Sequence, residues 1–390
     1  MKLIEPRPVP LGGLRAMTVR RLLPSRDRRM VGAWCFVDHY GPDDVAISGG
    51  MQVAAHPHTG LQTASWIFTG TIEHRDSLGT VADVRPGELN LMTAGCGINH
   101  TEYSTPETTV LHGIQLWIAL PRDDMNTAPA FENFVPDALT FGGQGAGQDG
   151  GGQDGEWASE HGGGGQGAGQ DGSAPAGVQA RVFLGELGVT VDGETKTGSS
   201  PVTTFSPLLG AEILVGEPGS DPQADKNPAA DAPRRSLTLT LNPAFEHGFV
   251  VDSGALLVQG QLVAADQMLF LDPGLSELTV EALGDTRLIL LGGAPFGEEI
   301  TMWWNFIGRS HEDIVAARQA WNEQVQAAQQ ADAGQQAQGA QQDQGKDRAQ
   351  GWEGRFGPVV QLPEQYAKVS PMLVIPAPAL PQTRLRGRKD

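Results

Sequence analysis

The sequence predicts an all-β protein made of two antiparallel barrels, with a short helix near its C-terminus. Short apolar and β-branched runs, each bounded by Gly, Pro or Asp, recur in two stretches, and this even spacing is typical of antiparallel barrels and sandwiches. A Gly-rich segment separates the two stretches, and 390 residues are enough for two domains of ordinary size.

The first stretch, residues 1–140, is predicted to form the N-terminal barrel. Its clearest strands are 66–69, 81–84 and 116–120, which are followed by Gly70, by the turn 85–87 and by Pro121. Apolar runs of four or five residues between turn signals are typical of short strands, so we expect this domain to be β throughout.

Residues 141–177 are of a different kind. The nonapeptide GGQGAGQDG occupies 142–150 and recurs unchanged at 164–172. Such residues bury too little apolar area to offset the loss of chain entropy. We therefore interpret the segment as a flexible linker, with a binding role as the less favoured alternative.

The second stretch, residues 178–309, is predicted to form the C-terminal barrel. Short β runs at 249–251, 255–258, 268–271 and 288–291 alternate with turns, and a polar, Pro-rich loop lies near 217–235. A helix is expected at 310–325, because Ser310 is a suitable N-cap and four apolar residues share one face: Ile314, Ala317, Trp321 and Val325. Residues 326–350 are rich in Gln, Ala and Gly and are expected to be disordered, and 351–390 to form an arm.

Charge and composition exclude several classes of function. Acidic residues outnumber basic ones by 46 to 27, and a net charge of −19 opposes direct binding of nucleic acid or anionic lipid. The basic end, 384–389, is interpreted as a terminal tail and not as a binding face. Two cysteines cannot form a disulfide framework, and no apolar run is long enough to span a membrane. We expect a soluble, cytoplasmic monomer.

Two short motifs carry residue types that bind metal ions, His56-Pro57-His58 and His100-Thr101-Glu102. Residues two apart on a strand point to the same face, so each motif would present two ligand atoms together. The 42 positions from His58 to His100 leave room for the strands and turns that close a barrel. If the two strands are neighbours, four ligands converge inside the barrel.

Three imidazoles and one carboxylate suit Fe, Mn, Ni, Cu or Zn, and an octahedral ion with four protein ligands keeps two positions for water, substrate or dioxygen. We predict one Fe²⁺ site with His56, His58, His100 and Glu102 as ligands. The ordinary alternative is that these histidines are hydrogen-bonded polar residues. Pro57 lacks an N–H group and should confine its strand to an edge or a bulge.

Five longer segments extend these motifs: DHYGP at 38–42, HPHTG at 56–60, EHRDSLG at 73–79, MTAGCGINHTE at 92–102 and LHGIQLWIALP at 111–121. Together they resemble the pirin family of the cupin superfamily, strongly over about 30–121 and more weakly into the C-terminal barrel. The resemblance implies two cupin barrels that face each other, with iron in the first barrel at His56, His58, His100 and Glu102.

The sequence departs from general cupins at Gln62, where they often have a glutamate ligand, so Glu102 must supply the carboxylate. The second barrel keeps Glu246-His247 near its first-motif position but shows no ligand pair, and is expected to be metal-free. Cys96 is interpreted as a small turn residue, with a redox-sensitive thiol as the alternative. His74 and His112 are either ordinary hydrogen-bonded histidines or neighbours of the site. The segment 303–306 (WWNF) is interpreted as a packing strip.

The sequence is consistent with two main functions, an enzyme and a regulator. Some pirins degrade flavonols such as quercetin with dioxygen, so the resemblance implies a quercetin 2,3-dioxygenase-like enzyme with a small-molecule substrate. Such an enzyme needs a base to deprotonate the substrate, and Glu102 could serve if it detaches from the metal. Other pirins act as iron-dependent, redox-responsive cofactors of transcription regulators or bind metabolic enzymes. The alternative is therefore a non-enzymatic regulator with protein partners, and a structural cupin is a third, less favoured interpretation.

Overall fold

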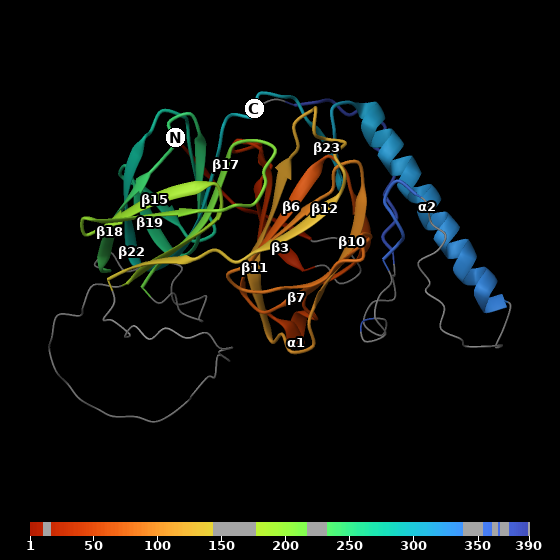
Figure 1. The fold of residues 1–390 in the computed structure, drawn as a ribbon, viewed down its shortest axis with the longest axis horizontal. Helices are drawn as coiled ribbons and strands as arrows, with labels where there is room; N and C mark the ends of the chain where they lie inside the picture. Colours follow the sequence, from red (N-terminus) through yellow and green to blue (C-terminus); the bar gives the residue numbers. More distant parts are fainter. Residues whose placement is uncertain are drawn as a thin grey trace.

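The computed structural model describes residues 1–10, 17–142, 177–216, 232–337, 354–360, 366 and 374–388. Two β-barrels stand side by side, and a long helix lies on the side of the first barrel that faces away from the second (Figure 1). Neighbouring strands pair antiparallel in both barrels. The prediction of an all-β fold with two barrels is confirmed.

The first barrel consists of a seven-stranded sheet and a four-stranded sheet. In spatial order the larger sheet contains β12 (Ala130–Phe134), β9 (Leu89–Thr93), β6 (Leu61–Thr69), β11 (Val110–Ala119), β4 (Trp34–Asp44), β3 (Thr18–Leu23) and β2 (Arg7–Pro10). The smaller contains β5 (Gln52–His58), β10 (Ile98–Ser104), β7 (Ile72–Asp76) and β8 (Val81–Val84). The four-residue helix α1, Val45–Ser48, follows β4.

The second barrel is one eleven-stranded sheet. Its main path runs through β1 (Lys2–Ile4), β21 (Met268–Leu271), β19 (Glu246–Val258), β22 (Glu277–Gly293), β17 (Leu208–Val215), β14 (Val178–Leu184) and β13 (Ala138–Phe141). Four more strands branch from it: β15 (Glu186–Val191), β16 (Glu194–Ser199), β18 (Arg234–Thr240) and β20 (Gln261–Ala264). Alternate apolar residues of these strands fill the interior of this barrel.

An apolar core joins the two barrels. The Trp66 ring from β6 stacks on the Phe183 ring from β14, with centroids 4.6 Å apart. Trp34 from β4 donates its indole N–H to the carbonyl oxygens of Leu209 and Gly292, at 3.2 and 3.1 Å. Because all these side chains are buried in one cluster, the barrels pack as a single unit.

The structure corrects three predicted domain boundaries. β1 pairs with β21 and β13 pairs with β14, so both strands belong to the second barrel although they lie wholly or mostly within the predicted first domain, 1–140. Figure 1 shows the N-terminus on the second barrel accordingly. Short edge strands carry no pattern that tells which sheet they join, because long-range pairing decides it. The predicted linker and the loop at 217–235 fall largely outside the described residues.

The third boundary concerns a hairpin of β23 (Thr301–Trp303) and β24 (Phe306–Gly308), which was assigned to the second domain, 178–309. It lies on the first barrel, where the Ile307 N–H donates to the Thr59 carbonyl oxygen at 3.0 Å. The chain thus returns to the first barrel after completing the second, and this return shapes the site described below.

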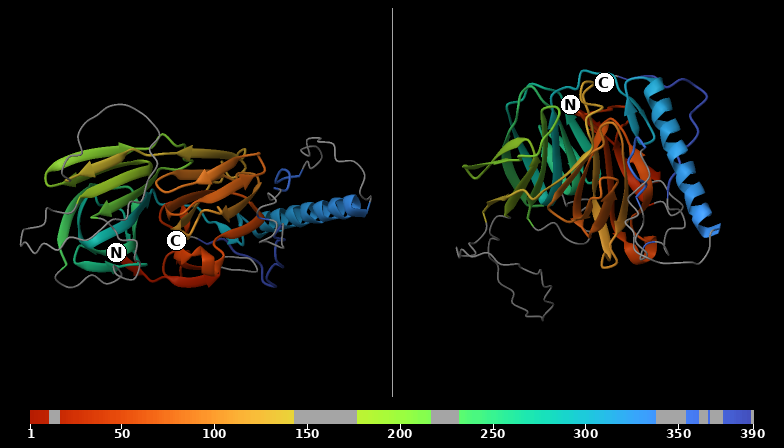
Figure 2. Two further views of the ribbon diagram at one scale, coloured as in Figure 1. Left: turned by 90° about the horizontal axis from the view of Figure 1, so that it is seen from below. Right: turned by 45° about the vertical axis from the view of Figure 1, so that its right-hand side comes forward.

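The long helix α2, His311–Ala337, begins where the sequence predicts. Its cap is reciprocal: the Asp313 N–H donates to the Ser310 hydroxyl at 3.1 Å, and the Ser310 N–H donates to the Asp313 carboxylate at 2.9 Å. All four residues of the predicted apolar face are buried: Ile314, Ala317, Trp321 and Val325. Figure 2 shows the helix extending beyond the first barrel.

The prediction that the helix ends at 325 is wrong, because it continues through 326–337. Ala and Gln are strong helix formers, and a helix already nucleated by a packed face extends at little cost in free energy. Described parts of the predicted arm, 351–390, pack against the first barrel and α2: the Trp321 indole donates to the Ile375 carbonyl oxygen at 2.8 Å. Neither helix within the described residues is long and apolar enough to cross a membrane.

Candidate metal centre

Three histidines from two neighbouring strands meet inside the first barrel. His100 on β10 lies directly opposite His56 on β5, and His58 shares the face of His56 because it is two residues further along that strand. Their ring centroids are 4.3 to 5.0 Å apart, and one nitrogen from each ring lies within 4.8 Å of the others. All three are buried, with exposed fractions of 6, 2 and 1% for His56, His58 and His100.

Pro57 lies on an edge strand, where a residue without a backbone N–H is tolerated. β5 is the edge strand of the four-stranded sheet, so the missing N–H of Pro57 removes no hydrogen bond to a second neighbouring strand. The prediction of an edge strand is confirmed, and the histidine pair can therefore flank a proline without loss of the sheet.

Hydrogen bonds orient two of the imidazoles. The Nδ1 of His56 lies 2.9 Å from the Ala54 carbonyl oxygen, and the Nδ1 of His58 lies 3.2 Å from the Asn305 carbonyl oxygen. A carbonyl can only accept, so each Nδ1 carries the proton and each Nε2 keeps its lone pair. This is the arrangement of histidines that bind a metal ion through Nε2.

A chain of side chains orients the third. The Nδ1 of His100 lies 3.3 Å from the Nδ1 of His74, whose Nε2 lies 3.2 Å from the Asp76 carboxylate. If His74 donates from Nε2 to Asp76, its Nδ1 accepts the proton of His100. The Nε2 of His100 is then left buried with no hydrogen-bond partner among the described residues. His74 is therefore a hydrogen-bonded histidine and also a neighbour of the site, so both of the roles considered from the sequence apply to it.

Burial keeps the imidazoles neutral. It lowers the pKa of His56 to about 4 and brings the pKa of His58 and of His100 well below the ordinary value, and neighbouring histidines lower both further. At neutral pH the three rings therefore offer lone pairs, and a buried neutral donor set is the form that binds a cation.

Glu102 lies close to this group but apart from it. It shares the face of His100 on β10 and lines the same cavity, yet its carboxylate is not among the mutually close donor atoms. A β-bulge lies between His100 and Glu102 in the pairing of β10 with β5, because His100 pairs with His56 whereas Glu102 pairs with Val53. Burial raises the pKa of Glu102, and the charge of His74 partly opposes this. The structure thus brings together three of the four predicted ligands.

A cavity of about 330 Å³ opens onto the three imidazoles. Phe36 and Trp117 form one wall, and their rings stack with centroids 4.1 Å apart. Trp304 and Asn305, at the turn between β23 and β24, also line it. Its other lining residues are Val9, Pro10, Arg21, Val53, Thr63, Gln115 and Ile375. The volume falls at the low end of the range of small-molecule sites, ~300–1,000 Å³.

The interpretation of 303–306 as a packing strip is therefore wrong in part. Phe306 is fully buried in the core beside α2, as expected, but Trp304 and Asn305 face the cavity. Trp304 adopts a φ of 52°, a turn conformation that interrupts the hairpin and sets these two residues apart from their neighbours. Sequence reasoning could not place this turn beside histidines almost 250 positions earlier.

Arg21 is a second residue that the sequence did not single out. Its Nε and Nη2 both donate to the Asp38 carboxylate at 2.7 Å, and its guanidinium carbon lies 4.2 Å from the centre of the Phe36 ring. A paired, stacked guanidinium is held in one place, so Arg21 supplies a fixed cation at the edge of an aromatic cavity.

His39, His112 and Asp252 form a second close group, between the barrels. Asp252 from β19 lies 2.6 Å from the Nε2 of His39 and 2.7 Å from the Nε2 of His112. Arg287 lies 3.4 Å from the same carboxylate, and Arg20 lies 3.2 Å from the Nδ1 of His39. These are hydrogen-bond lengths, and cations already compensate the carboxylate. We interpret the group as a hydrogen-bonded link between barrels, so His112 is an ordinary satisfied histidine.

The link also shifts pKa values. Burial alone would raise the pKa of Asp252, but hydrogen bonds from His112 and His39, and their charges, hold it well below its ordinary value. Burial lowers the pKa of His112, which the hydrogen bond and charge of Asp252 oppose. The folded state therefore favours an ionised Asp252.

Other residues singled out in the sequence have ordinary roles. Gln62, at the position of the general cupin glutamate, donates to the Thr93 hydroxyl at 2.9 Å. Cys96 is partly exposed on the turn before β10. Glu246 pairs with Arg28 and accepts the Gly32 N–H at 2.8 Å, so its carboxylate ties the second barrel to the first.

Comparisons with known proteins agree with this architecture. Residues 16–118 match the family Pirin, and residues 231–326 match the pirin C-terminal cupin domain. A Pseudomonas aeruginosa protein named "Putative quercetin 2,3-dioxygenase" is 39% identical over 82% of this chain and 83% of its own length. A pirin-like protein of Caulobacter vibrioides is 30% identical over 78% of this chain and 87% of its own. The crystal structure of a quercetin 2,3-dioxygenase from Acinetobacter baumannii has 31% identity and a TM-score of 0.67, and the match covers 99% of this chain and 97% of that one.

Proposed function

Because the chain belongs to the pirin family in both of its barrels, we propose that it binds one divalent metal ion in the first barrel and oxidises a flavonol-like compound with dioxygen. One observation carries the proposal: three neutral imidazoles present their Nε2 lone pairs to a cavity with aromatic walls. Relatives named for quercetin 2,3-dioxygenase activity support the choice of reaction.

The residues present fit a metal ion. The buried Nε2 of His100 has no partner among the described residues, and an unpaired polar atom in such a place costs free energy that a cation would recover. We assign His56, His58 and His100 as ligands through Nε2, with Glu102 as the fourth. Nitrogen with one carboxylate is a donor set for Fe²⁺, our first choice, or for Mn, Ni, Cu or Zn. When bound, such an ion supplies Lewis acidity and, if redox-active, a path for electrons to dioxygen.

The cavity walls suit a planar aromatic substrate. The stacked pair of Phe36 and Trp117 offers an apolar face, and Trp304 adds a third ring. Arg21 can donate a hydrogen bond to a hydroxyl or enolate oxygen of the substrate, although two of its N–H groups already donate to Asp38. A substrate bound between these walls would displace water from the imidazoles, which would strengthen the electrostatic contacts inside the cavity.

Among the described residues that line this cavity, Glu102 is the only one with a carboxylate. A flavonol must lose a hydroxyl proton before dioxygen attacks its ring, so a base is required, and Glu102 would serve as this base when its carboxylate detaches from the ion. Thr63 and Gln115 line the same cavity and offer polar groups that could orient the substrate hydroxyls.

The alternative, a metal- and redox-responsive regulator, would work through a protein surface. Such a regulator has no need of a cavity lined by three aromatic rings, which is why we favour the enzyme. A regulator would show metal-dependent retention of partners that His100→Ala abolishes, without turnover of a flavonol.

The test is anaerobic loading with Fe²⁺ followed by mixing with quercetin and admission of air. We expect oxygen-dependent loss of the flavonol absorbance, with oxygen consumed in step, and no loss under nitrogen. His100→Ala should abolish the reaction. His161→Ala is the matched control, because it removes a histidine from the predicted linker and should leave turnover intact. Stable quercetin under air, with protein that holds its metal, would contradict the proposal.

A further inference from the structure

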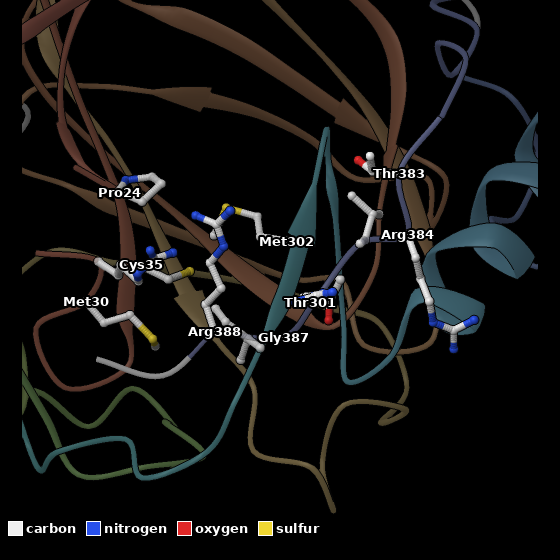
Figure 3. Close-up of a pocket in the computed structure, with 13 residues that line it drawn as sticks. Pro24, Met30, Cys35, Thr301, Met302, Thr383, Arg384, Gly387 and Arg388 are labelled. Atoms are coloured by element: carbon white, nitrogen blue, oxygen red, sulfur yellow. The ribbon is translucent and has the colours of Figure 1, made fainter. Parts of the chain in front are cut away.

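A second pocket, of about 950 Å³, lies outside the metal cavity and shares no lining residue with it. It is formed where the start of β4, the strand β23 and the C-terminal segment meet (Figure 3). Thirteen residues line it: Pro24, Arg29, Met30, Cys35, Ile300, Thr301, Met302, Thr383, Arg384, Leu385, Arg386, Gly387 and Arg388. The basic end of the chain, interpreted from the sequence as a tail, is therefore one wall of a pocket.

Hydrogen bonds hold that wall in place. The Arg388 N–H donates to the Ile300 carbonyl oxygen at 3.0 Å, and the Ile300 N–H donates to the Arg388 carbonyl oxygen at 3.3 Å. Three residues earlier, the Leu385 N–H donates to the Nδ1 of His311 at 3.2 Å. The segment is therefore fixed at two points, Arg388 and Leu385, and its backbone keeps a defined position along the pocket.

The pocket is basic in an acidic protein. Four of its thirteen lining residues are arginines and none is acidic, whereas the chain carries a net charge of −19. Arg384 pairs with Glu312 and points away from the pocket, but the Arg388 guanidinium reaches toward Met302 in its middle (Figure 3). Arg386 and Arg388 have no ion pair within the part of the chain that the structure describes. The Glu299 side chain, which is not among the lining residues, lies against Gly387, and its single charge offsets part of that of the arginines.

The floor of the pocket is apolar. Met30, Cys35 and Ile300 are buried in the core of the first barrel, and Met302 packs against the same cluster. One polar atom interrupts this floor: the Thr301 hydroxyl is buried and has no hydrogen-bond partner among the described residues.

From these contacts we propose that the pocket binds a small organic anion with an apolar body. Its carboxylate lies on Arg386 and Arg388, because a guanidinium matches the two oxygens of a carboxylate in one plane. Its hydrocarbon part lies on the apolar floor formed by Met30, Ile300 and Met302. This site is separate from the proposed dioxygenase centre and does not depend on it.

Isothermal titration of the full-length, metal-loaded protein tests the proposal with four probes. Octanoate combines the two features, octylammonium has the same chain with the opposite charge, and acetate and inorganic phosphate lack the apolar part. We expect saturable 1:1 binding of octanoate that weakens with added salt, and no binding of octylammonium. Equal binding of octanoate and octylammonium would show nonspecific apolar adsorption. Binding of phosphate as tight as that of octanoate would show a site for anions in general, with no role for the apolar part. Either result overturns the proposal, as does no binding of octanoate.

Matched variants locate the site. Arg388→Gln should weaken octanoate binding by roughly tenfold or more, as expected for loss of a charge-assisted contact. Arg384→Gln removes an equal charge four residues before Arg388, from a side chain that points out of the pocket, and should change binding little. Equal effects of Arg388→Gln and Arg384→Gln would overturn the assignment, since only bulk charge would then matter. Unchanged metal content in each variant shows that the fold is retained.

Discussion

Asp252→Ala is expected to lower the free energy of unfolding by about 3–5 kcal/mol, because it removes the buried acceptor that links the barrels. Asp252 is 6% exposed and lies 2.6 Å from His39 and 2.7 Å from His112, both of the other barrel. Each hydrogen bond to a charged acceptor contributes about 1.5–3 kcal/mol. Loss of both also leaves Arg287 without one of its carboxylate neighbours.

Urea unfolding followed by tryptophan fluorescence is the assay, since Trp34 and Trp66 are buried at the same interface. Glu281→Ala is the control: its ion pair with Arg234, at 3.1 Å, has side chains 37 and 57% exposed. Such a surface pair contributes less than about 1 kcal/mol. A loss for Asp252→Ala no greater than that of the control would refute the linking role of this carboxylate.

The pH dependence of stability follows from the same group. The folded state lowers the pKa of Asp252, so its stabilisation is complete above the ordinary value of 3.8 and is lost as the pH falls below it. The pKa of His112 is also lowered, so the unfolded chain takes up a proton below the ordinary 6.5 and stability falls from there. Unfolding midpoints measured from neutral to acidic pH should fall in two phases, and Asp252→Asn should lose the more acidic one.

Three further predictions concern the metal cavity and the helix. Asp76→Asn keeps the oxygen that accepts turn N–H groups but alters the partner of His74, so affinity for metal should fall about 10- to 100-fold in a chelator competition while the fold is retained. Trp304→Ala removes one aromatic wall and should raise the KM for quercetin about 2- to 10-fold with a smaller change in kcat; an unchanged KM would remove Trp304 from the substrate site. Gln326→Pro should cost up to about 3 kcal/mol and reduce helical circular dichroism, whereas Gln326→Ala should do neither, because α2 continues past 325.

Local rules were enough to find the histidines. The period of two along a strand placed His56 and His58 on one face, and likewise His100 and Glu102, while the missing N–H of Pro57 predicted an edge strand or a bulge. That the two histidine strands are neighbours was a condition of the prediction, which the pairing of β5 with β10 fulfils. The apolar face of α2 was equally visible, since Trp321 and its neighbours recur at helical spacing. These features depend only on residues close in sequence.

The residues that could not be predicted reach their sites through contacts between segments far apart in the sequence. Asn305 orients His58 from almost 250 positions away, and Trp304 lines the same cavity only because the hairpin β23–β24 crosses back onto the first barrel. Arg388 likewise becomes part of a pocket through pairing with Ile300. A sequence pattern shows that such segments are short strands or tails but carries no information on which distant edge they meet.

The most direct test of the account is the metal content of protein purified without added metal, measured by mass spectrometry for the wild type, His100→Ala and the linker control His161→Ala. Convergence of three Nε2 atoms predicts close to one equivalent of a single transition metal in the wild type and the control, and almost none in His100→Ala. Equal metal in all three proteins, or none in any of them after incubation with Fe²⁺, would contradict a metal centre at these histidines.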